Sequence, residues 1–266
     1  MTDAPLIVSE EPGIIICTLN RPAKLNAINQ QMIRGIREAV QTYAQRPDLR
    51  VFLLRATGRY FSAGADQLDR SGTGPDPKST SAIREWYRTE MMSGMQPLYD
   101  QMEAIEKPFV AAHQATCMGG GLEMSLSCDF RLAAKSASYA LPENKLGAIP
   151  ASGGVSRLTR LVGPHWSKWM IMGGQAVDAD LARTIGLAHA VYADDEFEAK
   201  VMEFCRHLAV QPVETIGMAK LTINLCADAD PGASRMVERL GQSILHIGEE
   251  SAVLHEAMRR KLSKTG

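Results

Sequence analysis

Residues 109–134 have the sequence FVAAHQATCMGGGLEMSLSCDFRLAA, in which two apolar runs flank a glycine triplet. The apolar runs predict strands over 109–113 and 130–133. Between them, Gly119–Gly121 predicts a tight turn, and the residues that follow predict a short helix over 122–127. Strands that alternate with helices favour an α/β fold with largely parallel strands.

The segments before this stretch continue the alternation. Residues 6–10 and 14–20 are apolar runs on either side of the turn EPG, and they predict a hairpin. Apolar residues at steps of three and four predict an amphipathic helix over 30–45, and the run at 51–54 predicts a buried strand. Residues 71–79, SGTGPDPKS, have the composition of a linker.

After about residue 195 the pattern becomes helical throughout, with apolar residues at helical spacing and no strand pattern between them. We therefore predict two parts, an α/β core over 1–195 and a helical C-terminal region over 196–266. The apolar stripes of the second part have two interpretations, an internal core or contacts between subunits.

Composition limits the function classes. The 266 residues carry 29 Lys and Arg against 30 Asp and Glu, and 45% of them are hydrophobic. A net charge of −1 argues against nucleic acid as a partner, and no apolar run approaches the roughly 20 residues of a membrane span. Five scattered cysteines without a CxxC pair, and a first segment unlike a signal peptide, lead us to expect a reducing, cytoplasmic location.

Several kinds of site have no matching motif. The six histidines form no HExxH pair, so no metal site is predicted. There is no GxSxG elbow and no GxxxxGK[ST] phosphate loop. The Gly119–Gly121 turn follows a strand and opens a helix, but Met124 stands where the third glycine of a dinucleotide fingerprint is required.

Three segments rich in small residues remain: 61–66 (FSAGAD), 119–123 (GGGLE) and 142–154 (PENKLGAIPASGG). Small residues allow backbone N–H groups to approach a ligand closely, and two such turns aimed at one point would form an oxyanion hole. Glu123 and Glu143 accompany these turns, and two carboxyls with raised pKa values can divide acid and base roles. For an isolated glutamate, the alternative is that it only complements a helix N-terminus.

Together with residues 20–29 (NRPAKLNAIN) and the Cys128-Asp129 pair, these segments resemble the crotonase superfamily, specifically the enoyl-CoA hydratase/isomerase family. The resemblance extends over residues 5–258 with matching order and spacing. It implies a spiral of ββα units with a C-terminal helical trimerisation region, and an assembly as a homotrimer or a dimer of trimers.

The resemblance also implies roles for single residues. The N–H groups of Ala65 and Gly120 would form the oxyanion hole for a thioester oxygen. Glu123 would activate water and Glu143 would protonate the α-carbon, so that a 2-enoyl-CoA gains water by syn addition and becomes a 3-hydroxyacyl-CoA. No metal or redox cofactor is implied, because coenzyme A is part of the substrate. Further contacts to substrate or CoA are expected from a group of seven residues: Lys24, Asn26, Ala27, Ala63, Asp66, Gly119 and Gly153.

Other functions remain open. An enoyl-CoA isomerase or a 3-hydroxyacyl-CoA lyase would use the same scaffold, and a CoA- or RNA-binding protein on it is a further alternative. Lys24 is either a phosphate contact or a solvated surface lysine. Three departures from the family pattern affect CoA contacts and acyl specificity: Gln67-Leu68 after the FSAGAD turn, Ala151 in place of a glycine, and Lys261 near a usual aromatic. The acyl chain is not given by the sequence.

Overall fold

The computed structural model describes residues 4–67 and 80–263, and the predicted linker at 71–79 lies outside the described residues. The chain divides into two compact units. Unit 1 comprises Met1–Ile105 and Phe109–Ala209, and unit 2 comprises Glu106–Pro108 and Val210–Gly266.

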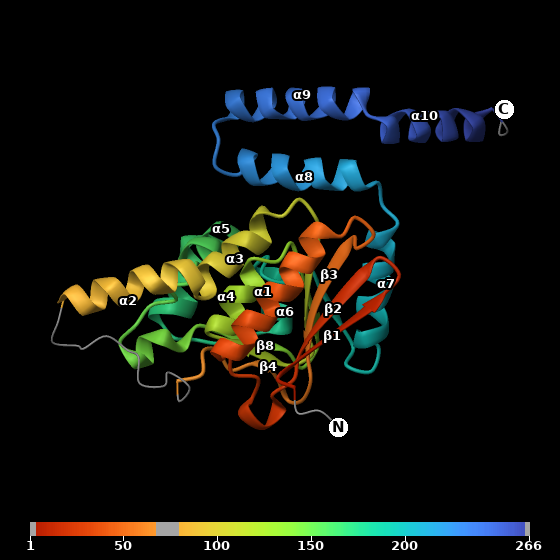
Figure 1. Ribbon diagram of the computed structural model, residues 1–266. Helices are drawn as coiled ribbons and strands as arrows, with labels where there is room; N and C mark the ends of the chain where they lie inside the picture. The colour runs from red at the N-terminus through yellow and green to blue at the C-terminus, as the bar shows by residue number, and fades with distance from the viewer. Residues whose placement is uncertain (1–3, 68–79, 264–266) are drawn as a thin grey trace. The chain divides into compact units, whose positions relative to one another are not determined.

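Unit 1 is built on a six-stranded sheet with the order β1-β2-β3-β5-β7-β10 (Figure 1). The edge pair β1 and β2 is antiparallel, and the other neighbours are parallel. Its strands are β1 (Leu6–Glu11), β2 (Ile14–Leu19), β3 (Val51–Ala56), β5 (Phe109–His113), β7 (Phe130–Ala134) and β10 (Ala190–Tyr192).

Alternate residues of the central strands supply two apolar cores. Ile15 and Phe52 point into the core formed with α1 (Gln30–Gln45), α3 (Met95–Ala104) and α4 (Gly120–Leu126). Ile14 and Val51 point to the opposite face, which is covered by α7 (Phe197–Ala209). The sheet is therefore buried on both sides, which explains the continuous apolar runs of its strands.

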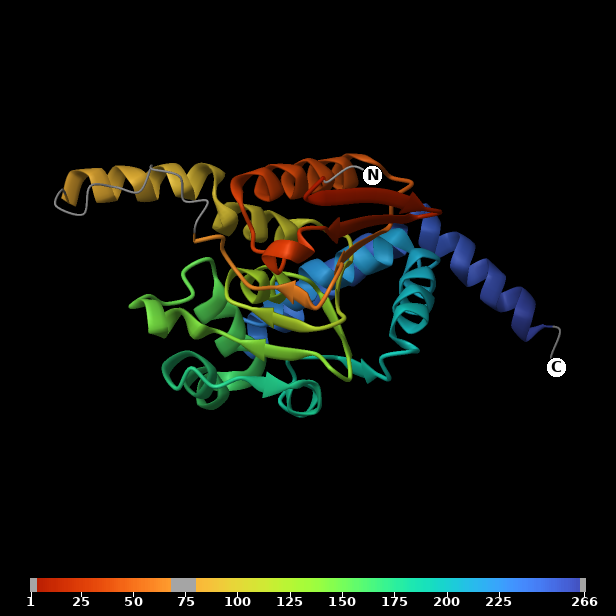
Figure 2. The ribbon, with the colours of Figure 1, turned by 90° about the horizontal axis from the view of Figure 1, so that it is seen from below.

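A second sheet lies next to the first and has the order β4-β6-β8-β9. In Figure 2 the arrows of its first three strands point the same way, and their pairing is parallel. Each of these three strands follows a strand of the large sheet along the chain and precedes a helical segment, so that ββα units recur. Its strands are β4 (Tyr60–Ser62), β6 (Thr116–Met118), β8 (Ser138–Ala140) and β9 (Val177–Asp178).

The remaining elements of unit 1 are helical. They are η1 (Pro22–Lys24), α2 (Thr80–Ser93), the 3-10 turn η2 (Pro142–Leu146), α5 (Gly154–Ser167), the π-helical turn η3 (Lys168–Met172) and α6 (Ala179–Thr184). Among the described residues, no helix of either unit is long and apolar enough to cross a membrane.

The predicted hairpin, the helix over 30–45 and the strand over 109–113 are confirmed. The short helix begins at Gly120 and not at the predicted residue 122, because its first glycines already adopt helical geometry. The second sheet was not predicted. Its strands have two or three residues each, too few for an alternating pattern to stand out.

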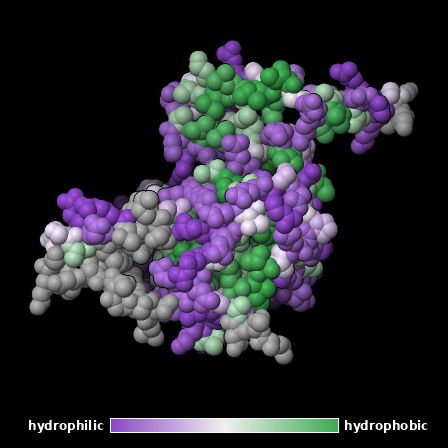
Figure 3. All heavy atoms as spheres, viewed as in Figure 1, coloured by the Kyte–Doolittle hydropathy of each residue, from purple (hydrophilic) through white to green (hydrophobic). Residues whose placement is uncertain are grey.

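Unit 2 contains α8 (Val213–Cys226), α9 (Pro231–Ile247) and α10 (Glu249–Leu262). Their apolar side chains are largely exposed, including Met236, Leu240 and Ile244 on α9, and hydrophobic atoms gather over this part of the surface (Figure 3). By contrast, α7 buries Val201 and Cys205 against the large sheet and belongs to unit 1. The division between units therefore falls after Ala209, whereas the sequence analysis divides the chain after residue 195.

Candidate active site

Two backbone turns meet at the ends of neighbouring strands. Strands β4 and β6 are parallel partners, so the turns that follow them emerge at the same edge of the small sheet. Gly64 has a φ of +92°, and a side chain on it would begin 3.2 Å from the nitrogen of Gly120. A side chain on Gly119, which has a φ of +54°, would begin 3.5 Å from Cα of Gly64. Glycine is required at both positions because the two backbones touch.

The N–H group of Ala65 points toward the second turn. Ala65 forms a parallel bridge with Ile28, in which the carbonyl of Gly64 and the N–H of Asp66 are used. In such a bridge the N–H of the middle residue faces the opposite side. A side chain on Gly120 would begin 3.4 Å from the Ala65 nitrogen.

The N–H group of Gly120 belongs to the first turn of α4, where backbone donors lack a partner within the helix. The hydroxyl of Tyr99 donates to the carbonyl of Gly120 at 2.9 Å and fixes the orientation of that residue. Ala65 and Gly120, the two predicted oxyanion donors, are thus adjacent, and a developing negative charge between them would be stabilised.

Glu123 is buried one turn further along α4, with only 4% of its surface exposed. Its Oε1 accepts hydrogen bonds from the N–H groups of Ser152, at 2.7 Å, and Gly154, at 3.1 Å. Burial raises the pKa of Glu123 to about 7, and the charge of Glu143 also raises it, whereas the two N–H donors and Arg157 lower it. The group is therefore divided between its two protonation states near neutral pH.

Glu143 approaches the same place from η2. Its Oε1 lies 3.2 Å from the point where a side chain on Gly119 would begin, so the carboxyl is directed at the glycine turn. Its Oε2 is buried, and within the described part of the chain it has no hydrogen-bond partner. Burial raises the pKa of Glu143 above its usual value. The two predicted catalytic carboxyls thus lie beside the two predicted oxyanion donors.

The segment before the FSAGAD turn was expected to contact CoA. Lys24 is exposed at the end of η1, next to this turn. Asn26 is fully buried, and both of its donors are used by the carbonyls of Thr57 and Tyr60. A ligand contact by that side chain would require breaking these bonds.

Arg21 interacts with two of the remaining residues that were predicted to contact the substrate, Ala27 and Asp66. Its guanidinium donates to the carbonyl of Ala27 and forms an ion pair with Asp66 at 3.0 Å. Ala63 donates its N–H to the carbonyl of Leu25, which ties the two segments together. Of the pair Gln67-Leu68, which departs from the family pattern after the FSAGAD turn, Gln67 is described, whereas Leu68 lies outside the described residues.

Gly153 adopts a left-handed conformation, with φ +90°, between Ser152 and Gly154. These two neighbours hold Glu123, and the sequence analysis did not select them. The sequence contained one usable signal, since a glycine pair immediately before a helix marks a place where backbone donors face a carboxylate. Tyr99 carried no such signal, because a tyrosine on an apolar helix face is normally a packing residue.

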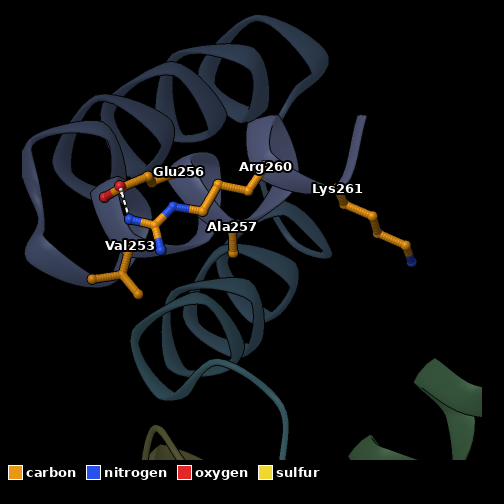
Figure 4. Close-up of a pocket in the computed structure, with 5 residues that line it drawn as sticks. All are labelled: Val253, Glu256, Ala257, Arg260 and Lys261. Atoms are coloured by element: carbon orange, nitrogen blue, oxygen red, sulfur yellow. Dashed lines mark hydrogen bonds and ion pairs between the residues drawn. The ribbon is translucent and has the colours of Figure 1, made fainter. Parts of the chain in front are cut away.

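Two other kinds of site come into question among the described residues, a metal site and a surface pocket. In the described ranges 4–67 and 80–263, no three His, Cys, Asp or Glu side chains are grouped so as to hold a metal ion. A hollow beside α10 in unit 2 is lined by Val253, Glu256, Ala257, Arg260 and Lys261 (Figure 4). There Arg260 pairs with Glu256 on the next turn, and Lys261 points away from the other four.

Solved structures share this architecture. An enoyl-CoA hydratase from Bacillus anthracis has a TM-score of 0.87 at 27% identity, and the match covers 97% of this chain and 96% of that one. The fold is thus that of the crotonase superfamily. The sequence model of the enoyl-CoA hydratase/isomerase family matches residues 9–246, and the chain belongs to this family.

Curated relatives carry different activities. The probable mitochondrial enoyl-CoA hydratase 2 of Arabidopsis thaliana is 32% identical over 86% of this chain and 73% of its own length. A 1,2-epoxyphenylacetyl-CoA isomerase of Escherichia coli is 31% identical over 80% of this chain and 79% of its own length. A hydratase and an isomerase are thus almost equally similar to this chain. The relatives therefore define its family but not its reaction.

Proposed function

We propose that this protein is an enoyl-CoA hydratase that adds water to a 2-enoyl-CoA and produces a 3-hydroxyacyl-CoA. The observation that carries the proposal is the presence of both Glu123 and Glu143 beside the N–H groups of Ala65 and Gly120. Addition of water needs two proton movements, one from the water and one to the α-carbon, and two carboxyls supply both. The homologous hydratases named above support the same reaction.

In the proposed mechanism, Ala65 and Gly120 bind the thioester oxygen. As hydroxide from the water bonds to the β-carbon, negative charge moves onto this oxygen, and the N–H groups stabilise it. Each such donor contributes a factor of about 10²–10³ in rate. The resulting enolate then takes a proton at the α-carbon, on the same face of the former double bond.

Glu123 takes the proton from water, and Glu143 gives a proton to the α-carbon. This division requires the pair to carry one proton, which fits two neighbouring carboxyls that both have raised pKa values. The two N–H donors on Oε1 of Glu123 favour its carboxylate form. A bound acyl group would remove water from Glu143, whose Oε2 has no donor among the described residues, and so keep the proton there.

The remaining parts of the proposal follow from the family. The substrate is an acyl-CoA whose phosphates we expect Lys24 to contact, and no metal or redox cofactor takes part. The protein acts in the cytoplasm as a homotrimer or a dimer of trimers, in which the exposed apolar stripes of unit 2 are covered by neighbouring subunits.

An assay with 2-enoyl-CoA esters of graded chain length tests the proposal. The expected product has the mass of the substrate plus one water, and its formation is lost in Glu123→Gln but kept in Glu203→Gln, a matched change at an exposed glutamate. A product with only a shifted double bond would identify an isomerase, and shortened products from 3-hydroxyacyl-CoA would identify a lyase. No reaction, together with salt-sensitive RNA binding, would contradict all three.

An isomerase is the second candidate. The similarity to the 1,2-epoxyphenylacetyl-CoA isomerase favours it, and an isomerase would use the same oxyanion hole. Isomerisation returns a proton to the substrate without adding water, so the same product analysis separates the two.

A further inference from the structure

Arg157 is a charged residue buried beneath the active site. It lies in the first turns of α5, and only 8% of its side chain is exposed. Its Nη2 donates to Asp100 at 2.6 Å and to Glu103 at 2.8 Å, and its Nε donates to Glu103 at 3.0 Å. Asp100 and Glu103 lie one turn apart on α3, so the planar guanidinium is held from one side by both.

The other side of the guanidinium contacts the turn formed by residues 152–154. Nη1 donates to the carbonyl of Ser152 at 3.4 Å. A side chain on Gly153 would begin 1.9 Å from Nη1, so the arginine fills the space directly under this residue. The same turn donates the N–H groups of Ser152 and Gly154 to Oε1 of Glu123.

We propose that Arg157 is a positioning residue for Glu123: held by Asp100 and Glu103, it fixes the Ser152–Gly154 turn, which in turn holds Oε1 and leaves Oε2 for proton transfer. The role in catalysis rests on the proposed function, whereas the effect on Glu123 itself does not. A lysine cannot reproduce this arrangement, because an ammonium is a point charge without a planar fork.

The groups that face Glu123 come from three elements. Glu143 on η2 disfavours its negative charge and Arg157 on α5 favours it. The hydroxyl of Tyr99 on α3 is neutral, because burial and the charge of Glu123 raise its pKa well above the usual value. Burial opposes ionisation as well. Loss of Arg157 removes the positive charge and loosens the two N–H donors, and both changes disfavour the carboxylate form of Glu123.

Two measurements on the full chain test the inference. The first is the titration of Glu123, followed by ¹³C NMR of labelled glutamate carboxyls, with the signal assigned by its absence in Glu123→Gln. The second is the pH profile of kcat/KM for the family substrate. The variants are Arg157→Gln, Arg157→Lys and Glu103→Gln. Arg160→Gln is the control, because it removes the same charge from the same helix one turn further on, where the guanidinium approaches Glu103 only to 4.0 Å, beyond hydrogen-bond distance.

In Arg157→Gln we expect the titration of Glu123 and the acidic limb of the profile to move up by on the order of one pH unit. At pH 7 this corresponds to a roughly fivefold lower kcat/KM, because the ionised fraction of Glu123 falls. Arg157→Lys and Glu103→Gln are expected to give a smaller shift in the same direction, and Arg160→Gln none. If Arg157→Gln does not fold, the milder variants Arg157→Lys and Glu103→Gln are used for the same measurements.

Unchanged titration of Glu123 in the folded Arg157 variants would overturn the inference. A wild-type result for Arg157→Lys would also overturn it, since a point charge would then suffice. If the titration of Glu123 shifted equally in Arg160→Gln, the cause would be the loss of any nearby positive charge, and the inference would be wrong. If the protein shows no activity on enoyl-CoA, the proposed function fails, but the NMR titration still decides whether Arg157 acts on Glu123.

Discussion

The two glutamates of the site sit in regions of very different construction. Glu123 lies on a regular helix, is almost fully buried, and has two backbone donors on one oxygen. Glu143 lies on the 3-10 turn η2, is partly exposed, and has a buried oxygen without a hydrogen-bond partner among the described residues. Hydrogen bonds thus hold the carboxyl of Glu123 in place, whereas one oxygen of Glu143 has no hydrogen-bond partner among the described residues.

This difference suits two distinct roles. A base must keep a fixed direction toward the water it activates, and the Ser152–Gly154 turn provides that for Glu123. An acid must stay protonated until it reacts, and burial of Oε2 of Glu143 without a donor from the described part of the chain favours its neutral form. The four changes below probe this contrast, from the largest expected effect to the smallest.

Glu123→Gln and Glu143→Gln should each lower kcat for hydration by about 10²–10⁴-fold, because each substitution removes a group that transfers one of the two protons. Because the two carboxyls share one proton, the double variant should be only slightly slower than the worse single one. Steady-state rates for the four enzymes test this, with Glu203→Gln as the unaffected control. If one single variant kept the wild-type rate, the site would work with one carboxyl, as expected of an isomerase.

The same substitution at Glu123 should stabilise the fold at high pH. The pKa of Glu123 is raised from 4.5 to about 7 in the folded protein, so its stabilising contribution is present below pH 4.5 and is lost as the pH rises through 7. Above that pH the buried charge costs about 3 kcal/mol, and Glu123→Gln removes this cost. Urea unfolding should therefore show a gain of up to about 3 kcal/mol at pH 8 and less than about 1 kcal/mol at pH 5.

The matched variant Glu143→Gln should change stability in the same direction but by less, since Glu143 is less buried and the rise in its pKa is smaller. Equal gains for the two variants, or a gain for Glu123→Gln that does not depend on pH, would contradict the contrast between the two environments.

Gly154→Ala should damage the environment of Glu123 without changing any charge. The new methyl group would begin 2.6 Å from Cβ of Pro150 and 2.8 Å from Cγ of Glu123, so the turn or the carboxyl must move. Overpacking of this kind costs about 1–3 kcal/mol of stability, and a displacement near 1 Å costs about 10²-fold in kcat. Thermal unfolding and kcat together measure both effects. A normal rate would mean that the hold on Oε1 is dispensable.

The sequence predicted the helix over 30–45 and the strands of the large sheet except β10, because apolar patterns of sufficient length determine them. The three-residue β10 was missed. The sequence also missed the small sheet, whose strands of two or three residues are defined by their partners and not by their own composition. The apolar stripes on α7 and α9 looked alike, yet one packs on the sheet of unit 1 and the other is exposed in unit 2, because periodicity does not specify what a helix meets.

For the site, the sequence selected the glutamates and the oxyanion glycine because each stands in a short motif of small residues. The sequence did not identify the residues that hold these side chains in place. Arg157 and Arg160 are equivalent in the sequence, three positions apart on one helix, and only the fold brings Asp100 and Glu103 to the first of them as a two-carboxylate clamp. The small residues of 152–154 mark the turn in the sequence, but no pattern indicates which side chain supports it from below.

The smallest effect is expected at Gly147, which ends η2 and so stands beside Glu143 as Gly154 stands beside Glu123. Gly147 has a φ of +66°, but a side chain on it would meet no atom within 4 Å. Gly147→Ala should therefore cost only the backbone penalty of about 1 kcal/mol, with kcat within about twofold of the wild type. Gly147→Asn should cost less than Gly147→Ala, because asparagine adopts this conformation more readily. If instead Gly147→Ala lowered kcat as much as Gly154→Ala, the turn under Glu143 would be as tightly constrained as the one that holds Glu123, and the division into a held base and a loosely supported acid would be wrong.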